Sequence, residues 1–176
     1  MTTTLQINGS DVEVPDGASV LDAVNASGTT ISQLCKDPDM KPIGACRTCI
    51  VQIDGTRGFP ASCSVPATDG MQVWTDSEDV TRVRSGVLEL TQAMVGSNGD
   101  GGHRELDLAA RSNGLDGPRW VSRQRESIDT SNPVFNIAMQ DCILCGRCAQ
   151  ACQEGVEVDD GAGVGAGHQH SGAIAH

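Results

Sequence analysis

The chain has 176 residues, of which 38% are hydrophobic and 2% are aromatic, and its formal net charge is −11. This length suits one domain or two small ones, and so little apolar material predicts a lean core that relies on a metal or a crosslink. The negative charge argues against binding to the phosphate backbone of a nucleic acid.

Two paired strands are predicted at the start of the chain. Residues 3–7 follow the alternating pattern of a half-buried strand, and residues 11–14 repeat it. Between them, Asn8-Gly9 is a strong hairpin signal. A short helix is predicted next, because Ser19 can cap it and Gly28 is placed to end it. Its apolar residues share one face: Val20, Leu21 and Val24.

Two further strands follow a loop that is rich in Cys, Pro and Gly. Residues 49–55 predict a buried strand that runs into an Asp-Gly turn, and residues 71–74 predict a last strand. This order of strands and helix indicates a small mixed α+β domain over residues 1–76.

The apolar period becomes helical from residue 77 onward. Apolar residues recur at steps of three and four, which predicts an amphipathic helix of about 18 residues that ends at Gly96. The residues that define this face are Val80, Val83, Val87, Leu90 and Met94.

The remaining segments are less regular. The glycine-rich residues 96–102 break the helix, residues 103–114 predict a short second helix, and the proline-containing residues 115–140 read as an extended connector. Residues 159–176 have the composition of a mobile, poorly packed tail. We therefore expect its histidines not to bind a metal: His168, His170 and His176.

The N-terminus lacks the features of a secretory signal, and no segment approaches the roughly 18 apolar residues of a membrane span. We therefore expect a soluble, cytoplasmic protein. In a reducing compartment, ordered cysteines are metal ligands or redox groups more often than disulfides.

The first four cysteines have the spacing C-x10-C-x2-C-x13-C and are Cys35, Cys46, Cys49 and Cys63. Four thiolates are what a 2Fe-2S cluster needs, two on each iron. Gly44 and Ala45 have little or no side chain, so backbone N–H groups can approach cluster sulfurs there. A structural zinc site is the alternative on spacing, although such sites more often show two C-x2-C pairs.

Residues 19–77, with the phrases "GACRTC", "PASC" and "DGMQVWTDS", resemble a known family. This is the N-terminal β-grasp 2Fe-2S domain of the large iron-sulfur subunit of NADH dehydrogenases, NAD-linked formate dehydrogenases, diaphorase subunits of NAD-reducing hydrogenases and iron-only hydrogenases. The resemblance implies a ferredoxin-like β-grasp fold whose 2Fe-2S ligands are Cys35, Cys46, Cys49 and Cys63.

The middle of the chain departs from that family, in which one His and three Cys bind a 4Fe-4S cluster. Here no cysteine lies between Cys63 and Cys142, although "RELDLAARSNG" resembles the end of that segment. We therefore expect residues 77–114 to be a helical module without these ligands, and we expect His103 to be a surface residue.

The last four cysteines have the spacing C-x2-C-x2-C-x3-C and are Cys142, Cys145, Cys148 and Cys152. This run is far more specific for a 4Fe-4S cluster than for zinc, and Gly146 permits the tight turn that it needs. It also resembles the first motif of the family's two-cluster ferredoxin insert. We therefore expect a ferredoxin-type 4Fe-4S segment over residues 141–158.

The fourth ligand of this second cluster has three possible sources. Cys152 closes the cluster locally, or a partner chain provides the ligand, or two copies of the chain exchange Cys152. The sequence favours local closure slightly, because all eight cysteines are then used within one chain.

The sequence contains no nucleophile with a base, no paired catalytic carboxylates and no phosphate-binding glycine loop. We therefore expect an electron-transfer subunit that relays single electrons between an NAD or flavin partner and a catalytic subunit. By resemblance, the hetero-oligomer is of the formate dehydrogenase or soluble hydrogenase type. The alternatives are a free ferredoxin-like carrier and a redox-sensing or assembly protein with labile clusters.

Overall fold

A computed structural model describes residues 1–95, 104–121 and 128–154. The predictions made for the glycine-rich breaker, for His103 and for the C-terminal tail with its histidines lie outside these residues. No helix among the described residues has both the length and the apolar character needed to cross a bilayer.

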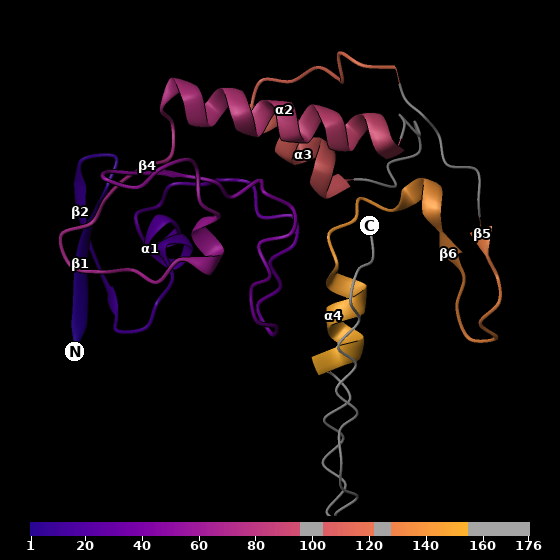
Figure 1. The fold of residues 1–176 in the computed structure, drawn as a ribbon, viewed down its shortest axis with the longest axis horizontal. Coiled ribbons are helices and arrows are strands. Elements are labelled where there is room, and N and C mark those ends of the chain that lie inside the picture. The colour runs from indigo at the N-terminus through magenta and orange to yellow at the C-terminus, as the bar shows by residue number, and fades with distance from the viewer. Residues whose placement is uncertain (96–103, 122–127, 155–176) are drawn as a thin grey trace, which may run out of the picture.

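A four-stranded sheet forms the N-terminal part of the chain (Figure 1). Strands β1 (Thr2–Ile7) and β2 (Ser10–Pro15) form an antiparallel hairpin, as predicted, and positive φ angles at Asn8 and Gly9 make its tight turn. Strand β4 (Gln72–Trp74) pairs in parallel with β1, and β3 (Gln52–Ile53) pairs antiparallel with β4. The strand order is therefore β2-β1-β4-β3.

Strand β3 is shorter than the strand predicted over residues 49–55. The carbonyls just before it have partners outside the ladder: Ser62 donates to the Cys49 carbonyl through both its N–H and its hydroxyl, and Arg84 donates to that of Ile50. These bonds direct the backbone into the cysteine loop, so only two residues remain in the sheet.

Helix α1 (Val20–Ala26) packs against this sheet and begins with a capping box, which confirms the predicted cap. The Ser19 hydroxyl accepts from the Asp22 N–H, and the Asp22 carboxylate accepts from the Ser19 N–H. The predicted apolar face, Val20, Leu21 and Val24, is fully buried. It packs in a core with residues of the strands and of the segment before β3: Leu5, Ile7, Val14, Val51 and Val73.

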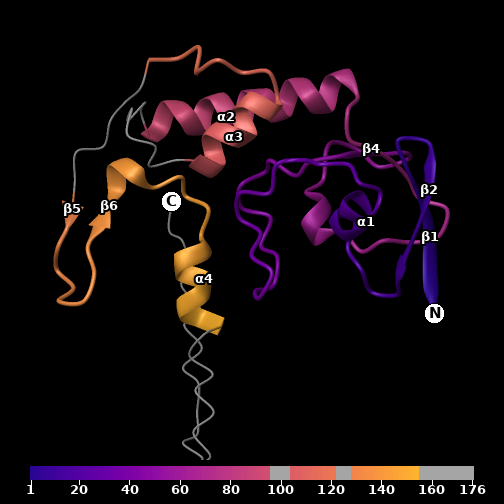
Figure 2. The ribbon, with the colours of Figure 1, turned by 180° about the vertical axis from the view of Figure 1, so that it is seen from behind.

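Helices α2 (Glu78–Val95) and α3 (Arg104–Ser112) pack together beyond the sheet, and α2 bridges toward the C-terminal part in both views (Figures 1 and 2). The predicted face of α2 is only partly correct. Val80, Arg84 and Leu88 are buried, whereas Leu90 is 54% exposed. The elements that α2 packs against lie on the side of Val80, Arg84 and Leu88. Of the other predicted residues, Val83 is half-buried, and Val87, Leu90 and Met94 line a cavity of about 250 Å³ together with the C-terminal part.

The segment after α3 is fastened to α2. Glu89 of α2 is 4% exposed, and its carboxylate accepts from Arg119 Nε at 2.8 and 2.9 Å and from Nη2 at 2.6 Å. The predicted connector also contains a two-residue antiparallel pair, β5 (Ile128–Asp129) with β6 (Ile137–Ala138), which its sequence did not indicate. The 3-10 turn η2 (Met139–Asp141) and helix α4 (Arg147–Glu154) complete the described chain.

Candidate metal centres

The first four cysteines come from separate parts of the N-terminal domain. Cys35 lies in the loop after α1, Cys46 and Cys49 precede β3, and Cys63 lies in the 3-10 turn η1 (Ser62–Ser64). Cys35, Cys49 and Cys63 are each at most 2% exposed, and Cys46 is half-buried. The fold thus gathers in one place thiols that are distant in the sequence.

These thiols form two neighbouring pairs. The Cys35 thiol and the Cys46 thiol are hydrogen-bonded, and the Cys49 thiol donates to the sulfur of Cys63. Cys63 is also close enough to Cys35 for its charge to act on that thiol. All eight cysteines lie in the described part of the chain, and none of them is in a disulfide there.

Burial and mutual contact shift the acidity of these thiols. Burial raises the pKa of Cys35 to about 11. The hydrogen bond between Cys49 and Cys63, with burial, raises the pKa of Cys49, and the same hydrogen bond lowers that of Cys63. Four thiolates are therefore unfavourable here without a cation, and metal binding would supply the compensating positive charge.

The loop around Gly44 and Ser64 places hydrogen-bond donors on these sulfurs. Gly44 has φ +64°, and its backbone N–H donates to Cys63, as predicted for this position. A Cβ at Gly44 would lie 2.9 Å from Ser64 Oγ, so a side chain does not fit there. Ser64 Oγ lies 3.5 Å from Cys63 Sγ, and Thr48 Oγ1 lies 3.1 Å from Cys46 Sγ. The loop therefore surrounds the sulfurs with polar groups.

The last four cysteines lie close together in the sequence and are more exposed than the first four. Cys142 and Cys145 are half-buried in the loop between η2 and α4, whereas Cys148 and Cys152 are exposed and one helical turn apart on α4. Leu144 and Gly146 have positive φ angles, which gives the tight turn predicted at Gly146.

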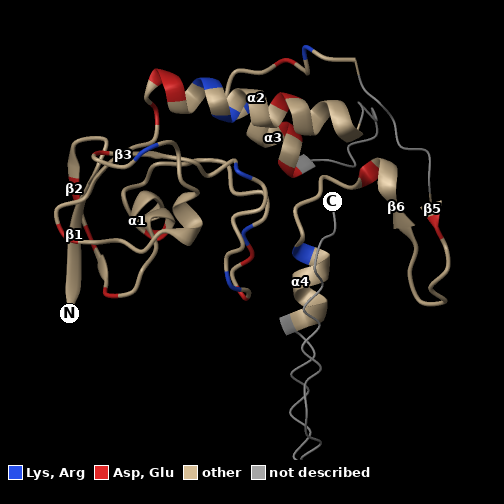
Figure 3. Cartoon of the chain, in the orientation of Figure 1, with Lys and Arg blue, Asp and Glu red and all other residues tan. Residues whose placement is uncertain are grey.

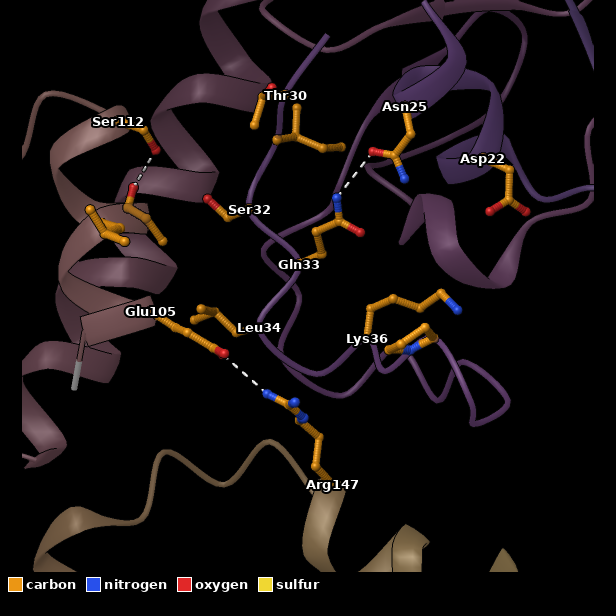
Figure 4. Close-up of a pocket in the computed structure, with 14 residues that line it drawn as sticks. Asp22, Asn25, Thr30, Ser32, Gln33, Leu34, Lys36, Glu105, Ser112 and Arg147 are labelled. Atoms are coloured by element: carbon orange, nitrogen blue, oxygen red, sulfur yellow. Dashed lines mark hydrogen bonds and ion pairs between the residues drawn. The ribbon is translucent and has the colours of Figure 1, made fainter. Parts of the chain in front are cut away.

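Arg147, between the last cysteines, holds this segment against the rest of the protein. Its guanidinium donates to Glu105 Oε2 of α3 at 3.1 Å (Figure 4). It also donates to Asp37 Oδ2 of the first cysteine loop at 3.4 Å. The Gln150 side-chain amide also donates to the Lys41 carbonyl. Figure 3 shows acidic residues on α3 and one basic segment at the start of α4, in keeping with this contact.

A cavity and a small core lie where the two cysteine regions meet. The cavity, of about 980 Å³, is lined by apolar residues and by polar and charged ones that include Gln33, Lys36 and Arg147 (Figure 4). The core packs both cysteine regions together, because Cys46 of the first and Ile143 of the second contact it. Its buried members are Leu34, Leu88, Val95, Leu106 and Ala109.

Three comparisons identify what this arrangement resembles. Residues 1–78 match the family of 2Fe-2S iron-sulfur cluster binding domains. The chain is 34% identical over 157 residues to a subunit of the NADH-quinone oxidoreductase of Mycobacterium tuberculosis, in a match that spans 84% of this chain and 19% of the relative. It is 32% identical over 158 residues to the alpha chain of the NADPH-Fe(3+) oxidoreductase of Geobacter sulfurreducens, spanning 86% and 18% of the two chains.

A solved structure is similar over a larger share of its own length. A chain of an NAD+-reducing [NiFe]-hydrogenase in the H2-reduced state superposes with a TM-score of 0.74 at 32% identity, covering 87% of this chain and 67% of that one. The chain therefore belongs to the family that its sequence resembles, the iron-sulfur subunits that carry an N-terminal 2Fe-2S domain in NADH dehydrogenases and NAD-reducing hydrogenases. The resemblance inferred from the cysteine motifs is thereby confirmed, and so is the N-terminal 2Fe-2S domain. The chain spans about a fifth of the length of the curated relatives described above.

The first cysteine set of this family member fits a 2Fe-2S cluster. Two hydrogen-bonded thiol pairs match the need for two thiolates on each of two irons, and Gly44 leaves room for backbone to approach the sulfurs. Among the described residues, no three Cys, His, Asp or Glu side chains are grouped as a single metal ion requires.

Sequence reasoning missed one residue beside this site. Arg84 is buried, and its guanidinium donates to backbone carbonyls on either side of Cys49. Its position four residues after Val80 and four before Leu88 was the available signal, because all three lie on one helix face.

Proposed function

We propose that the chain is an electron-transfer module that holds one 2Fe-2S and one 4Fe-4S cluster and relays single electrons within a larger oxidoreductase. The proposed 2Fe-2S ligands are Cys35, Cys46, Cys49 and Cys63, and the proposed 4Fe-4S ligands are Cys142, Cys145, Cys148 and Cys152. The observation that carries this proposal is the pairing of four largely buried thiols in the 2Fe-2S domain.

The chemistry of such a module needs no bond to a substrate. When bound, the clusters supply one-electron oxidation and reduction. The residues of this chain hold the sulfurs, exclude water from Cys35, Cys49 and Cys63, and donate hydrogen bonds to the sulfurs from Gly44 and Ser64. Burial and these hydrogen bonds set the reduction potential of the site.

Contacts between the two cysteine regions support a relay. Arg147 joins the second region to Asp37, two residues after Cys35. Ile143, next to Cys142, and Cys46 also contact the same small core. Both proposed clusters are therefore linked by packed protein rather than by a free tether.

The proposed partners are an NAD or flavin subunit and the catalytic subunit of a formate dehydrogenase or soluble hydrogenase type. The names of the similar proteins support this assignment, since they are oxidoreductases that use NADH, NADPH or NAD+. Exposed apolar residues on the connector favour a subunit over a free carrier, because exposed apolar patches mark interaction surfaces. They are Val121, Ile128, Val134 and Phe135.

A redox titration followed by EPR spectroscopy tests the proposal. The purified protein should contain iron and acid-labile sulfide and show two reversible signals, one from each cluster. Zinc in place of iron, or a single signal in a protein loaded with iron and sulfide under anaerobic conditions, would contradict it. Irreversible loss of the second signal on oxidation would favour a redox sensor, and recovery as a stable monomer free of larger subunits would favour a free carrier.

A further inference from the structure

Arg84 places a buried guanidinium next to the first cysteine set. It lies on the face of α2 that packs against the N-terminal domain and is 5% exposed. Among the salt bridges of the described residues, none involves Arg84. A buried cation without a paired carboxylate is costly, so its surroundings must compensate for the charge.

Three backbone carbonyls accept all the hydrogen bonds that Arg84 forms in the described chain. Nε donates to the Thr48 carbonyl at 3.1 Å, and Nη2 donates to the carbonyls of Ile50 at 2.7 Å and Thr75 at 3.0 Å. Thr48 and Ile50 are the two neighbours of Cys49. The guanidinium therefore fixes the backbone on both sides of a proposed ligand and ties it to α2 and to the end of β4.

The carbonyls on both sides of Cys49 hold the Arg84 guanidinium beside that residue. Burial lowers the pKa of Arg84, so its positive charge needs compensation from its surroundings. Cys49 itself is 1% exposed, so little solvent screens the interaction between the two groups. An iron-bound thiolate at Cys49 would provide the negative charge that this buried cation lacks.

We propose that Arg84 is a positioning residue for the 2Fe-2S site that also raises its reduction potential. Reduction adds one electron to the site and neither forms nor breaks a bond. A fixed positive charge beside Cys49 stabilises the more negative reduced state, and the three carbonyl contacts keep that charge in place. This inference rests on the proposed assignment of Cys49 as a ligand.

The test compares the 2Fe-2S midpoint potential of the whole protein with that of two variants at Arg84, using dithionite as the reductant and EPR as the readout. Arg84→Gln removes the charge and keeps a hydrogen-bond donor. We expect it to make reduction roughly tenfold less favourable, a fall of about 59 mV for one electron. Arg84→Lys keeps the charge, and we expect a change below about threefold.

Arg82→Gln is the matched control, because Arg82 lies on the same helix in an exposed ion pair with Asp79. It should leave the potential unchanged. An unchanged potential in Arg84→Gln with a full cluster would overturn the inference. If Arg84→Gln does not fold, the test rests on Arg84→Lys. A tenfold less favourable reduction in that variant would show that the positive charge does not set the potential and would overturn the inference. Absence of a 2Fe-2S signal in the unaltered protein would instead contradict the proposed function.

Discussion

The two cysteine regions differ in how the fold prepares them. The first set is assembled from loops that are distant in the sequence. Three of its four thiols are buried, and two of these, Cys49 and Cys63, lie in the core of the N-terminal domain. The second set is local, with Cys148 and Cys152 exposed on one short helix. The first site therefore depends on the folding of its whole domain, whereas the second depends more on its metal and on contacts with neighbouring elements.

The largest effect is expected from Cys49→Ser. Cys49 is buried and its thiol is hydrogen-bonded to Cys63, so this change should abolish or strongly weaken the 2Fe-2S signal and destabilise the N-terminal domain. Iron content, visible absorption and thermal denaturation measure both effects. Cys152→Ser is the control for this domain and should keep the 2Fe-2S signal. An unchanged 2Fe-2S spectrum in Cys49→Ser would show that this cysteine is not a ligand.

Cys152→Ser should have a narrower effect, confined to the second region. Because Cys152 is exposed on α4, we expect the N-terminal domain to keep its stability while the 4Fe-4S signal is lost or altered. EPR spectra and iron content of the purified single chain measure this outcome. A full complement of iron would show instead that Cys152 is not the fourth ligand, whether from its own chain or exchanged between two copies.

The smallest effect is expected from Arg147→Ala, which removes the two ion pairs that hold α4 to Asp37 and Glu105. Both pairs are partly exposed, so each contributes under about 1 kcal/mol. Hydrogen exchange should speed up in α4 and remain unchanged in α1. Arg82→Ala removes an exposed ion pair of α2 and should leave α4 unaffected. Unaltered exchange in α4 would mean that the apolar contacts alone hold the second region.

Local signals allowed much of the N-terminal domain to be predicted. Asn8-Gly9 specifies its hairpin and Ser19 its helix cap, because both act through bonds to residues close in sequence. The spacing of the cysteines likewise indicated the 2Fe-2S domain, and the small side chain of Gly44 indicated that backbone could approach sulfur there.

Features that depend on distant partners could not be predicted in this way. Apolar periodicity placed Leu90 on the buried face of α2, although the partners of the helix lie on the side of Arg84. A buried arginine gives no apolar signal, and its carbonyl partners become visible only when the strands are in place. The late start of strand β3, after Ile50, has the same cause.

The contact between Arg119 and Glu89 keeps the two cysteine regions near each other even when the direct contacts between these regions break. Because Arg119 is bound in bidentate fashion to a buried carboxylate of α2, the linker to the second cysteine region starts at Trp120 rather than at Asn113, just after α3. A shorter linker raises the effective concentration of one region at the other. After such an opening, the second cysteine region rebinds to the first within the same molecule. Because α2 fixes the point from which the linker starts, it makes this rebinding more probable.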